Sequence, residues 1–276
     1  WEQGGRGYED AVEGVALRRL LPETGRLLLE LGAGAGRNTP RYAGFERVVL
    51  LDYSLTQLQQ AVQRLGHSQR YLYVAADIYR LPFVPGLFDA ATMIRTLHHM
   101  ADAPLALRQV RRVLQPGANF ILEYANKHNL KAIFRYWLRK QSWSPFTLEP
   151  VEFTSLNYDF HPQAVRNWLA ECGFEGKRQL TVSHFRLGLF KKLLPLRLLV
   201  WMDGMAQLTG EWWQLTPSVF TLSRAVGETP VAPSGAFFQC PGCGNASLDE
   251  QDAGLHCSLC SKTWPVVDGI YDFRAA

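Results

Sequence analysis

Five residues near the N-terminus have the types and spacing that a nucleotide-like ligand needs. An apolar run ending in Glu30 is followed at once by three alternating glycines, Gly32, Gly34 and Gly36. Glycine has no Cβ, so such a loop lets a ligand approach the backbone. The next apolar run ends in Asp52, at a spacing where a carboxylate can accept both hydroxyls of a ribose. Two acids at successive strand ends thus predict one nucleotide-like ligand between them.

Four of the five cysteines form a second pattern, close to the C-terminus. Cys240 with Cys243 and Cys257 with Cys260 make two Cys-x-x-Cys pairs. Two such pairs can place four thiolates tetrahedrally around Zn²⁺, and a site whose four positions are filled by protein is structural rather than catalytic. Two disulfides are the alternative, which a reducing compartment disfavours. The pattern therefore predicts a structural zinc site.

The elements that must position these residues alternate between strand and helix, as in a doubly wound α/β sheet. Ser54 is placed to cap one helix, and Pro104 falls in the first turn of another. The strands are expected at 26–31, 47–51, 70–75, 88–94 and 119–124, followed by strands at 177–185 and 218–223, the last of them antiparallel. The helices are expected at 12–21, 36–43, 54–65 and 103–114.

The order of these motifs resembles the class I S-adenosylmethionine-dependent methyltransferases with a type 11-like methyltransferase domain. The segments that carry the resemblance are 30–36, 52–54, 76–78, 81–83, 88–89, 97–100 and 112–117. The resemblance implies an α/β fold, with a doubly wound, mostly parallel, seven-stranded Rossmann-like methyltransferase sheet. In that family the first and fourth strands lie side by side, and the cofactor lies over their carboxyl ends.

The resemblance also implies the cofactor, S-adenosylmethionine, and its product, S-adenosylhomocysteine. Glu30 and the glycine loop are then expected around the methionine part, Asp52 at the ribose and Asp77 at the adenine. Tyr8 is expected to close over the site. The complete expected cofactor set is Tyr8, Glu30, Gly32, Ala33, Gly34, Gly36, Asn38, Asp52, Tyr53, Asp77, Ile78, Arg95 and Leu97.

Little dedicated catalytic machinery is required, because the sulfonium methyl group is already activated toward in-line attack. The candidates for a general base are His98 and His99 after the fourth strand and Glu123 near the end of the fifth, since these strand ends face the expected pocket. The alternative for both histidines is that they set the loop conformation.

The domain boundaries follow from the resemblance and from composition. The methyltransferase domain is expected at 1–226, with helical lid insertions at about 125–160 and 186–215. Residues 227–235 are rich in Pro, Gly and Ser and indicate a linker. Residues 236–276 are expected to form a zinc ribbon. This ribbon resembles the Trm112-like zinc domain, whose free-standing members bind and activate methyltransferases, so a fused copy is expected to dock in cis.

The first insertion contains a basic amphipathic helix over 129–140. One interpretation is that its apolar face covers the substrate pocket while its charges are solvated. The other gives the charges an acidic partner: a phosphate-bearing substrate, RNA or an anionic membrane surface. The second insertion, which contains Trp residues, allows the same two interpretations: a cover over the substrate pocket or a surface for a partner.

Overall charge and hydropathy say little about the partners and the cellular location of the protein. The net charge of +4, from 29 basic and 25 acidic residues, is too small to indicate a nucleic-acid partner by itself. The most apolar stretch, 187–202, is interrupted by charges and is shorter than the ~20 residues of a membrane span. Since no signal-peptide pattern is visible, a cytoplasmic protein without a transmembrane segment is expected, with peripheral membrane contact left open.

The favoured function is methyl transfer to a small apolar or aromatic molecule, because the insertions are apolar and the overall charge is weak. An RNA methyltransferase acting on rRNA or tRNA is the alternative, which the basic helix and the ribbon support. A non-catalytic S-adenosylmethionine-binding partner protein is the second alternative.

Overall fold

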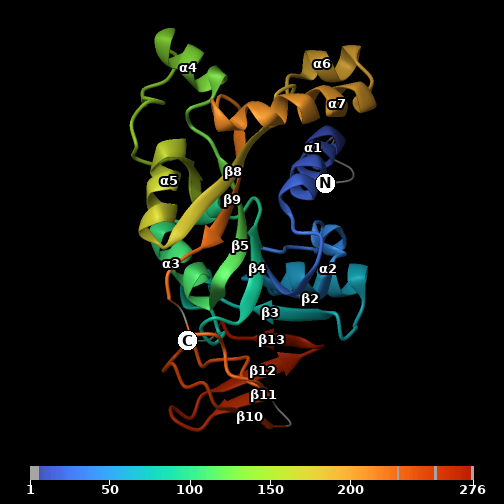
Figure 1. Ribbon diagram of the computed structural model, residues 1–276, viewed down its shortest axis with the longest axis vertical. Coiled ribbons are helices and arrows are strands. Elements are labelled where there is room, and N and C mark those ends of the chain that lie inside the picture. Colours follow the sequence, from blue (N-terminus) through green and yellow to red (C-terminus); the bar gives the residue numbers. More distant parts are fainter. Residues whose placement is uncertain (1–5, 229, 252–253, 275–276) are drawn as a thin grey trace.

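One large sheet runs through the molecule. The computed structural model describes residues 6–228, 230–251 and 254–274. Eleven strands form the sheet in the order β10-β11-β12-β13-β3-β2-β1-β4-β5-β9-β8 (Figure 1). Its first seven strands along the chain are β1 (Gly25–Leu31), β2 (Phe45–Asp52), β3 (Tyr71–Ala75), β4 (Phe88–Met93), β5 (Leu114–Ala125), β8 (Phe174–Val182) and β9 (Ser218–Ala225).

These seven strands form the expected methyltransferase sheet. β1 lies between β2 and β4, and all the pairs from β3 to β5 are parallel. β9 is inserted antiparallel between β5 and β8, as predicted for the last strand. The predicted count of seven is too small for the whole sheet, however, because the C-terminal segment adds β13 to the free edge of β3 and continues beyond it.

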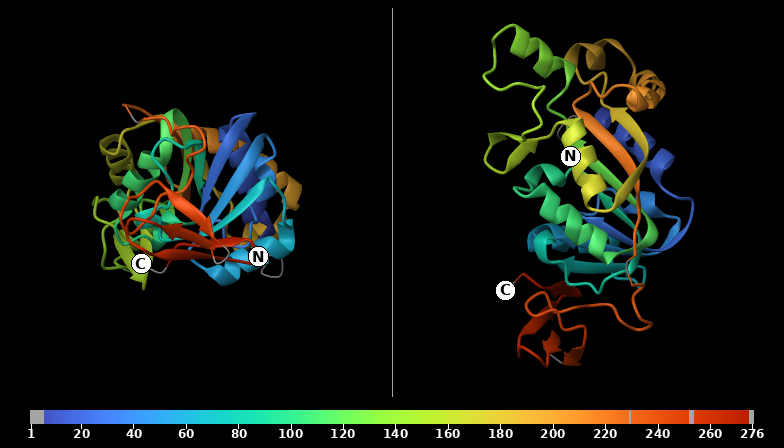
Figure 2. Two further views of the ribbon diagram at one scale, coloured as in Figure 1. Left: turned by 90° about the horizontal axis from the view of Figure 1, so that it is seen from below. Right: turned by 60° about the vertical axis from the view of Figure 1, so that its left-hand side comes forward.

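Helices cover both faces of the sheet (Figure 2). Alternate residues of β1 separate the two faces: Leu29 belongs to a core shared with α3 and α5, and Leu28 to a core shared with α2. The expected caps are present, since Ser54 Oγ accepts the Gln57 amide and Pro104 lies in the first turn of α3. The helices that cover the two faces are α1 (Gly7–Leu20), α2 (Leu55–Leu65), α3 (Ala103–Val113) and α5 (Pro162–Glu171).

The helix predicted over 36–43 is wrong. Only a 3₁₀ turn, η1 (Thr39–Tyr42), is found there. The Thr39 hydroxyl donates to the buried carboxylate of Glu30 at 2.6 Å, which directs this turn inward. Pro40 has no N–H for a helical hydrogen bond, and β2 already begins at Phe45, so the segment has no room for a regular helix.

Both insertions project at the end of the molecule opposite the C-terminal strands (Figures 1 and 2). The first contains α4 (Leu130–Trp137) and a hairpin of β6 (Val151–Thr154) and β7 (Asn157–Asp159). The second contains α6 (Gly188–Leu193), α7 (Leu196–Ala206) and the 3₁₀ turn η4 (Gln207–Glu211). In the described part of the chain, no helix combines the length and apolarity that crossing a bilayer requires.

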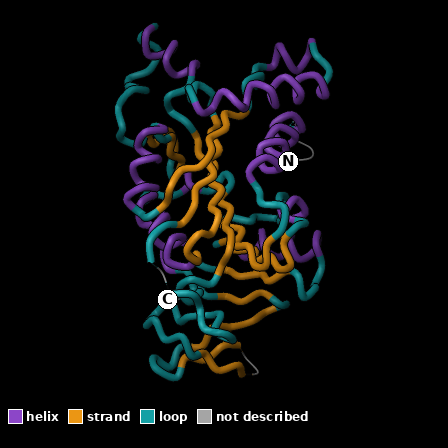
Figure 3. Tube along the Cα trace, in the orientation of Figure 1, coloured by secondary structure: helices purple, strands orange, loops and turns teal. Residues whose placement is uncertain are grey.

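The cysteine-rich segment consists of strands and loops (Figure 3). Its strands are β10 (Leu248–Gln251), β11 (Gly254–Cys257), β12 (Thr263–Val267) and β13 (Ile270–Asp272). β13 pairs in parallel with β3, and the amide of Phe273 donates to Ala75 O at 2.7 Å. Aromatic side chains pack between the cysteine-rich segment and the rest of the chain: the ring of Phe238 lies 5.8 Å from that of Phe83 and 5.0 Å from that of Phe273.

The connecting segment before the ribbon also lies against the main sheet domain. The amide of Ala232 donates to Gly86 O at 3.0 Å. A Cβ on Gly86 would lie 1.9 Å from Pro230 O, so only glycine allows the two backbones to approach so closely. The described residues of this segment are therefore held along the domain rather than extended away from it.

Candidate cofactor site

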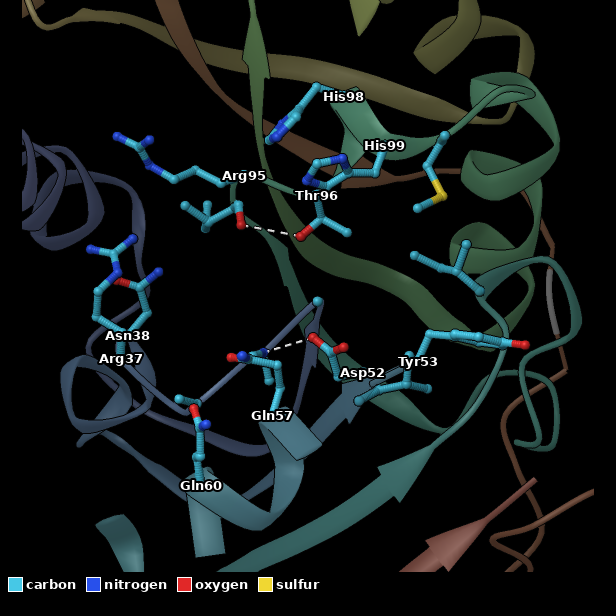
Figure 4. A pocket seen from close by; sticks show the side chains of 18 of the residues that line it. Arg37, Asn38, Asp52, Tyr53, Gln57, Gln60, Arg95, Thr96, His98 and His99 are labelled. Carbon is cyan, nitrogen blue, oxygen red and sulfur yellow. Dashed lines mark hydrogen bonds between the residues drawn. The ribbon is translucent and has the colours of Figure 1, made fainter. Parts of the chain in front are cut away.

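A cavity of about 1350 Å³ opens where β1, β2, β3 and β4 end. Residues at the end of each strand, or within two positions after it, line the cavity: Gly32, Asp52, Asp77 and Arg95. Figure 4 shows Asp52, Gln57 and Gln60 on one side, with Arg95, Thr96, His98 and His99 facing them from the other. Ligands of open parallel sheets bind at this edge, outside the carboxyl ends of the strands.

Two glycines of the loop after β1 are required by packing against protein. Gly32 has φ +69°, and a Cβ there would lie 2.0 Å from Thr96 Oγ1. Gly36 has φ +71°, and a Cβ there would lie 2.8 Å from a Leu65 methyl carbon. Gly34 alone faces open space, since a Cβ there would meet only Gln57 Oε1 at 3.4 Å. Of the three loop glycines, Gly34 is therefore the one whose missing side chain leaves space for a ligand.

Asp52 is fixed at the cavity wall by two backbone amides. Its Oδ2 accepts the Gly34 N–H and its Oδ1 accepts the Ser54 N–H, both at 2.8 Å. Each carboxylate oxygen can accept more than one hydrogen bond, so both remain available to hydroxyl groups of a ligand. Asp77 is held similarly, as its Oδ1 accepts the Tyr79 amide at 2.9 Å and caps a short 3₁₀ turn.

A network of charges joins α1 to the loops after β1 and β4. Asp10 pairs with Arg37 and with Arg41, the latter at 2.7 Å. Glu13 is buried and pairs with both Arg37, at 2.9 Å, and Arg95. Because Asp10 and the three arginines also line the cavity, this wall is lined by charged groups of both signs.

The position of Arg95 depends on a buried carboxylate from β5. Arg95 has φ +56°, a left-handed conformation that side chains other than glycine adopt at an energetic cost. Its amide donates to Glu123 Oε2 at 2.8 Å, and Ser218 Oγ donates to Glu123 Oε1 at 2.6 Å. Both oxygens of Glu123 are thus occupied within the protein, and this carboxylate holds a loop of the cavity in place.

The two histidines after β4 differ in their surroundings. Both line the cavity, and their ring centroids are 4.0 Å apart. Burial first, and then the neighbouring His99 and Arg95, lower the pKa of His98 to about 4. His99 is exposed, and its Nδ1 lies 3.0 Å from Leu156 O on the β6–β7 hairpin. His98 is therefore neutral at physiological pH, and one of its ring nitrogens can accept a proton.

The structure brings most of the predicted site residues together at the cavity. Those that line it are Gly32, Ala33, Gly34, Asn38, Asp52, Tyr53, Asp77, Ile78, Arg95, His98 and His99. Those outside its lining are Tyr8, Glu30, Gly36, Leu97 and Glu123.

Tyr8 is not a cover over the cavity. Its ring is buried, and its hydroxyl donates to Asp203 at 2.6 Å, because α7 packs against α1 at this point. Glu30 lies beneath the glycine loop, where burial raises the pKa of its carboxyl to about 7 despite hydrogen bonds from Thr39 and Tyr42. Leu97 is fully buried in the core and supports the histidine turn from behind.

Several cavity residues were not predicted from the sequence. Arg37 directly follows the glycine loop, and this position in the sequence could have indicated that it lies at the cavity. Residues from α1 and α2 had no such signal, because only the packing of these helices brings them to the strand ends. The unpredicted lining residues include Arg6, Gly7, Asp10, Arg37, Arg41, Gln57, Gln60, Arg64, Tyr79, Thr96 and Met100.

The insertions do not line the cavity, contrary to the expectation of a lid over it. Among the described residues, every one that lines it falls between 6 and 100. The inward face of α4 is small, with Ala132 and Ile133 buried, and α7 buries Leu199 and Asp203 against α1. These contacts hold both helices at the end of the molecule and leave their other faces exposed.

The four C-terminal cysteines converge on one point. Their Sγ atoms all lie within 4.8 Å of one another, with 3.7 Å between Cys240 and Cys260 and 3.5 Å between Cys243 and Cys257. A tetrahedral site with zinc–sulfur bonds of about 2.3 Å places its sulfurs about 3.8 Å apart. The cluster therefore has the dimensions that such a site requires.

Comparison with known families agrees with this fold. Residues 29–122 match the family model of a methyltransferase domain. The match runs from β1 into β5 and so contains all four strand ends that line the cavity. The chain therefore contains a methyltransferase domain over these residues.

Individual relatives match over part of their length. An O-methyltransferase of Penicillium expansum is 31% identical over 109 residues, which are 38% of this chain and 40% of that protein. A demethylmenaquinone methyltransferase of Clavibacter sepedonicus is 27% identical over 153 residues, which are 55% of this chain and 62% of that protein. The chain spans about half the length of these curated relatives.

A solved structure shares the fold over most of the chain. It is a chain of the Haloferax volcanii complex that contains the Trm112 methyltransferase activator. The TM-score is 0.59 at 16% identity, over 82% of this chain and 94% of that chain. At this level of identity the similarity shows a common fold.

Proposed function

We propose that this protein transfers a methyl group from S-adenosylmethionine to a small apolar or aromatic molecule. The observation that carries the proposal is the meeting of Gly34, Asp52 and Asp77 at one cavity, from three successive strand ends. The matched methyltransferase family has its cofactor at this edge of the sheet, and residues 29–122 contain all three groups.

The residues present fit the cofactor. Asp52 would hold the ribose hydroxyls, and Asp77 with Ile78 would adjoin the adenine. The α-carboxylate of the cofactor's methionine part would lie near Arg37 and Arg95, because guanidinium groups are complementary to carboxylates. When bound, S-adenosylmethionine supplies an electrophilic methyl group, and the protein has to align the acceptor and exclude water.

The cavity leaves room for an acceptor beside the cofactor. Its volume of about 1350 Å³ exceeds the ~300–1,000 Å³ of an ordinary small-molecule pocket. The relatives named O-methyltransferase and demethylmenaquinone methyltransferase support a small-molecule acceptor for this chain as well. We propose His98 as the base that removes a proton from an acceptor hydroxyl or amine, since its ring is neutral and lines the cavity.

We further propose that residues 1–226 and 236–276 act as one unit, with 227–235 as the connection. The zinc ribbon would stay docked in cis through the pairing of β13 with β3. A structural Zn²⁺ held by Cys240, Cys243, Cys257 and Cys260 would keep β11 and β12 in place for this contact.

Calorimetry with S-adenosylhomocysteine tests the cofactor assignment. Asp52→Ala is expected to weaken binding at least ~10-fold, because a hydrogen bond to a charged group contributes about 1.5–3 kcal/mol. Glu46→Ala, an exposed change on the same strand, serves as the control and should leave the affinity unchanged. Equal affinities of the wild type and a folded Asp52→Ala variant would reject the assignment.

A labelled-methyl transfer assay on fractionated cell extract tests the acceptor. Label in the small-molecule fraction is expected. Label in RNA would overturn the proposed acceptor while leaving methyl transfer intact. Tight cofactor binding with no labelled product in any fraction would instead favour a non-catalytic binding protein.

A further inference from the structure

Helix α4 carries an apolar stripe that faces solvent. Leu130, Phe134, Trp137 and Leu138 recur at positions i, i+4, i+7 and i+8, which places them on one side of a helix. All four are exposed, and Trp137 keeps 64% of its surface accessible. Large contiguous apolar surfaces are rare on monomeric proteins and indicate a binding partner.

The second insertion carries a matching stripe. Leu198, Trp201, Met205, Leu208 and Trp212 follow one another at alternating spacings of three and four residues through α7 and η4. All of them are exposed, with Trp201 at 65% and Trp212 at 78%. The opposite side of α7 packs on α1, so the exposed side has no contact with the rest of the described chain that would explain its apolar character.

Most of the charges beside both stripes are basic. Between 126 and 148 the chain has five basic residues and no acid, and four of the five, Lys131, Arg135, Arg139 and Lys140, are exposed. Between 186 and 211 there are two acids: Asp203 is buried, and Glu211 accepts the Gln179 amide at 2.8 Å, while Lys192 and Arg197 are exposed. Each stripe of Trp, Leu, Phe or Met side chains is therefore bordered by cations.

Both stripes lie at the same end of the molecule, away from the ribbon (Figures 1 and 2). We propose that this end, formed by α4, α7 and η4, binds the surface of an anionic lipid bilayer. Indole and leucine side chains enter the interface between headgroups and acyl chains, and flanking Lys and Arg bind lipid phosphates. The inference concerns an interaction surface and does not depend on the identity of the methyl acceptor.

Charge and side-chain type favour a bilayer over other partners. A second copy of this chain would bring two basic surfaces together, and like charges repel across an interface. Single-stranded RNA is bound through aromatic stacking and cations, whereas Leu130, Leu138, Leu198 and Met205 offer no ring for a base. An anionic bilayer is complementary to both the aliphatic and the basic parts of this surface.

Co-sedimentation of the full-length protein with vesicles tests the proposal. The protein should sediment with vesicles of phosphatidylcholine plus phosphatidylglycerol, and much less with phosphatidylcholine alone. Reversing three charges in Arg135→Glu/Arg139→Glu/Lys140→Glu should weaken partitioning by at least ~100-fold, since each basic residue near an anionic surface contributes about a factor of five and the added acids are repelled. Trp137→Ser/Trp212→Ser should reduce binding and diminish the blue shift of tryptophan fluorescence, to which Trp201 still contributes.

Matched variants control for net charge and for general loss of apolar surface. Arg26→Glu/Arg47→Glu/Arg108→Glu makes the same charge change at exposed positions elsewhere, and Leu259→Ser removes an exposed apolar side chain of the ribbon. Both controls should bind vesicles like the wild type. Circular dichroism and S-adenosylhomocysteine binding should show that every variant is folded.

Three results would overturn the proposal. They are equal sedimentation with neutral and anionic vesicles, equal losses in the test and control charge variants, or absence of vesicle binding by the wild type. Binding of tRNA in a gel-shift assay that Arg135→Glu/Arg139→Glu/Lys140→Glu abolishes, without any vesicle binding, would assign the surface to RNA instead.

Discussion

The buried carboxylate of Glu13 binds the guanidinium of Arg95, with 2.6 Å between Glu13 Oε1 and Arg95 Nε. The two residues are far apart in sequence, and their pairing ties α1 to the loop after β4. The second oxygen of Glu13 binds Arg37, which follows the glycine loop. One side chain thus connects three segments that border the cofactor cavity.

Removing this charge should destabilise the protein. Glu13→Gln is expected to lower the free energy of unfolding by about 2–4 kcal/mol, because hydrogen bonds to charged groups contribute about 1.5–3 kcal/mol each. For a chain of this size, that corresponds to a melting temperature lower by about 5–10 °C. Thermal denaturation followed by circular dichroism measures the change. Glu23→Gln, at an exposed position, should have almost no effect, and equal shifts in the two variants would contradict the role of Glu13.

Glu30 should make stability depend on pH near neutrality. Burial raises the pKa of its carboxyl from 4.5 in the unfolded chain to about 7 in the folded protein. The folded state therefore binds more protons between these two values, and its stability is full below pH 4.5 and falls as pH rises through about 7. The loss is on the order of 3 kcal/mol for this group, since one pKa unit corresponds to about 1.4 kcal/mol.

The variant Glu30→Gln isolates this effect from other titrating groups. Gln does not ionise, so the stability difference between wild type and variant should shift in favour of the variant as pH rises from 5 to 8. Urea unfolding at several pH values provides the measurement. Parallel pH profiles of the two proteins would show that Glu30 does not titrate in this range.

His98 and His99 should differ in their effect on turnover. If His98 is the base, His98→Asn should reduce kcat by about 10²–10⁴-fold, the usual contribution of general base catalysis. His99→Asn should change it far less, because His99 is exposed and faces Leu156. Since the pKa of His98 lies at about 4, the rate should rise with pH through 4 and then stay level as far as this group is concerned. Equal losses in the two variants would argue against a specific base.

Metal removal should affect both stability and cofactor binding. The purified chain is expected to contain one zinc per molecule, and Cys243→Ser or a strong chelator should remove it and lower the melting temperature. Cofactor affinity should fall as well. β13 pairs with β3, which leads to Asp77, and Arg274 donates to the backbone oxygen of Tyr53 at the cavity.

A cysteine outside the cluster provides the control for this experiment. Cys172 is buried beside Pro104, far from the other four in sequence. Cys172→Ala should keep the full zinc content, as measured by elemental analysis. A zinc content that stays unchanged in Cys243→Ser would contradict the assignment of that ligand.

Local patterns predicted the central sheet well, because its information lies in short contiguous segments. The apolar runs at 26–31 and 47–51 became β1 and β2, and the residues just after them lie at the cavity. Where a side chain's role depended on distant contacts, prediction failed. Tyr8 faces Asp203 instead of the cavity, and Glu123 holds Arg95 and Ser218 instead of facing a substrate.

The sequence by itself determined the class of fold, the strand ends at the ligand site and the four thiols of the ribbon. Strand periodicity, glycine positions and ligand spacing are local properties, so they can be read along one chain. Only the tertiary structure decided that β13 extends the sheet at β3, that Glu13 joins two arginines, and that α4 and α7 leave apolar stripes in solvent. These outcomes depend on which surfaces are left to pair once the helices have packed, and no local pattern contains that information.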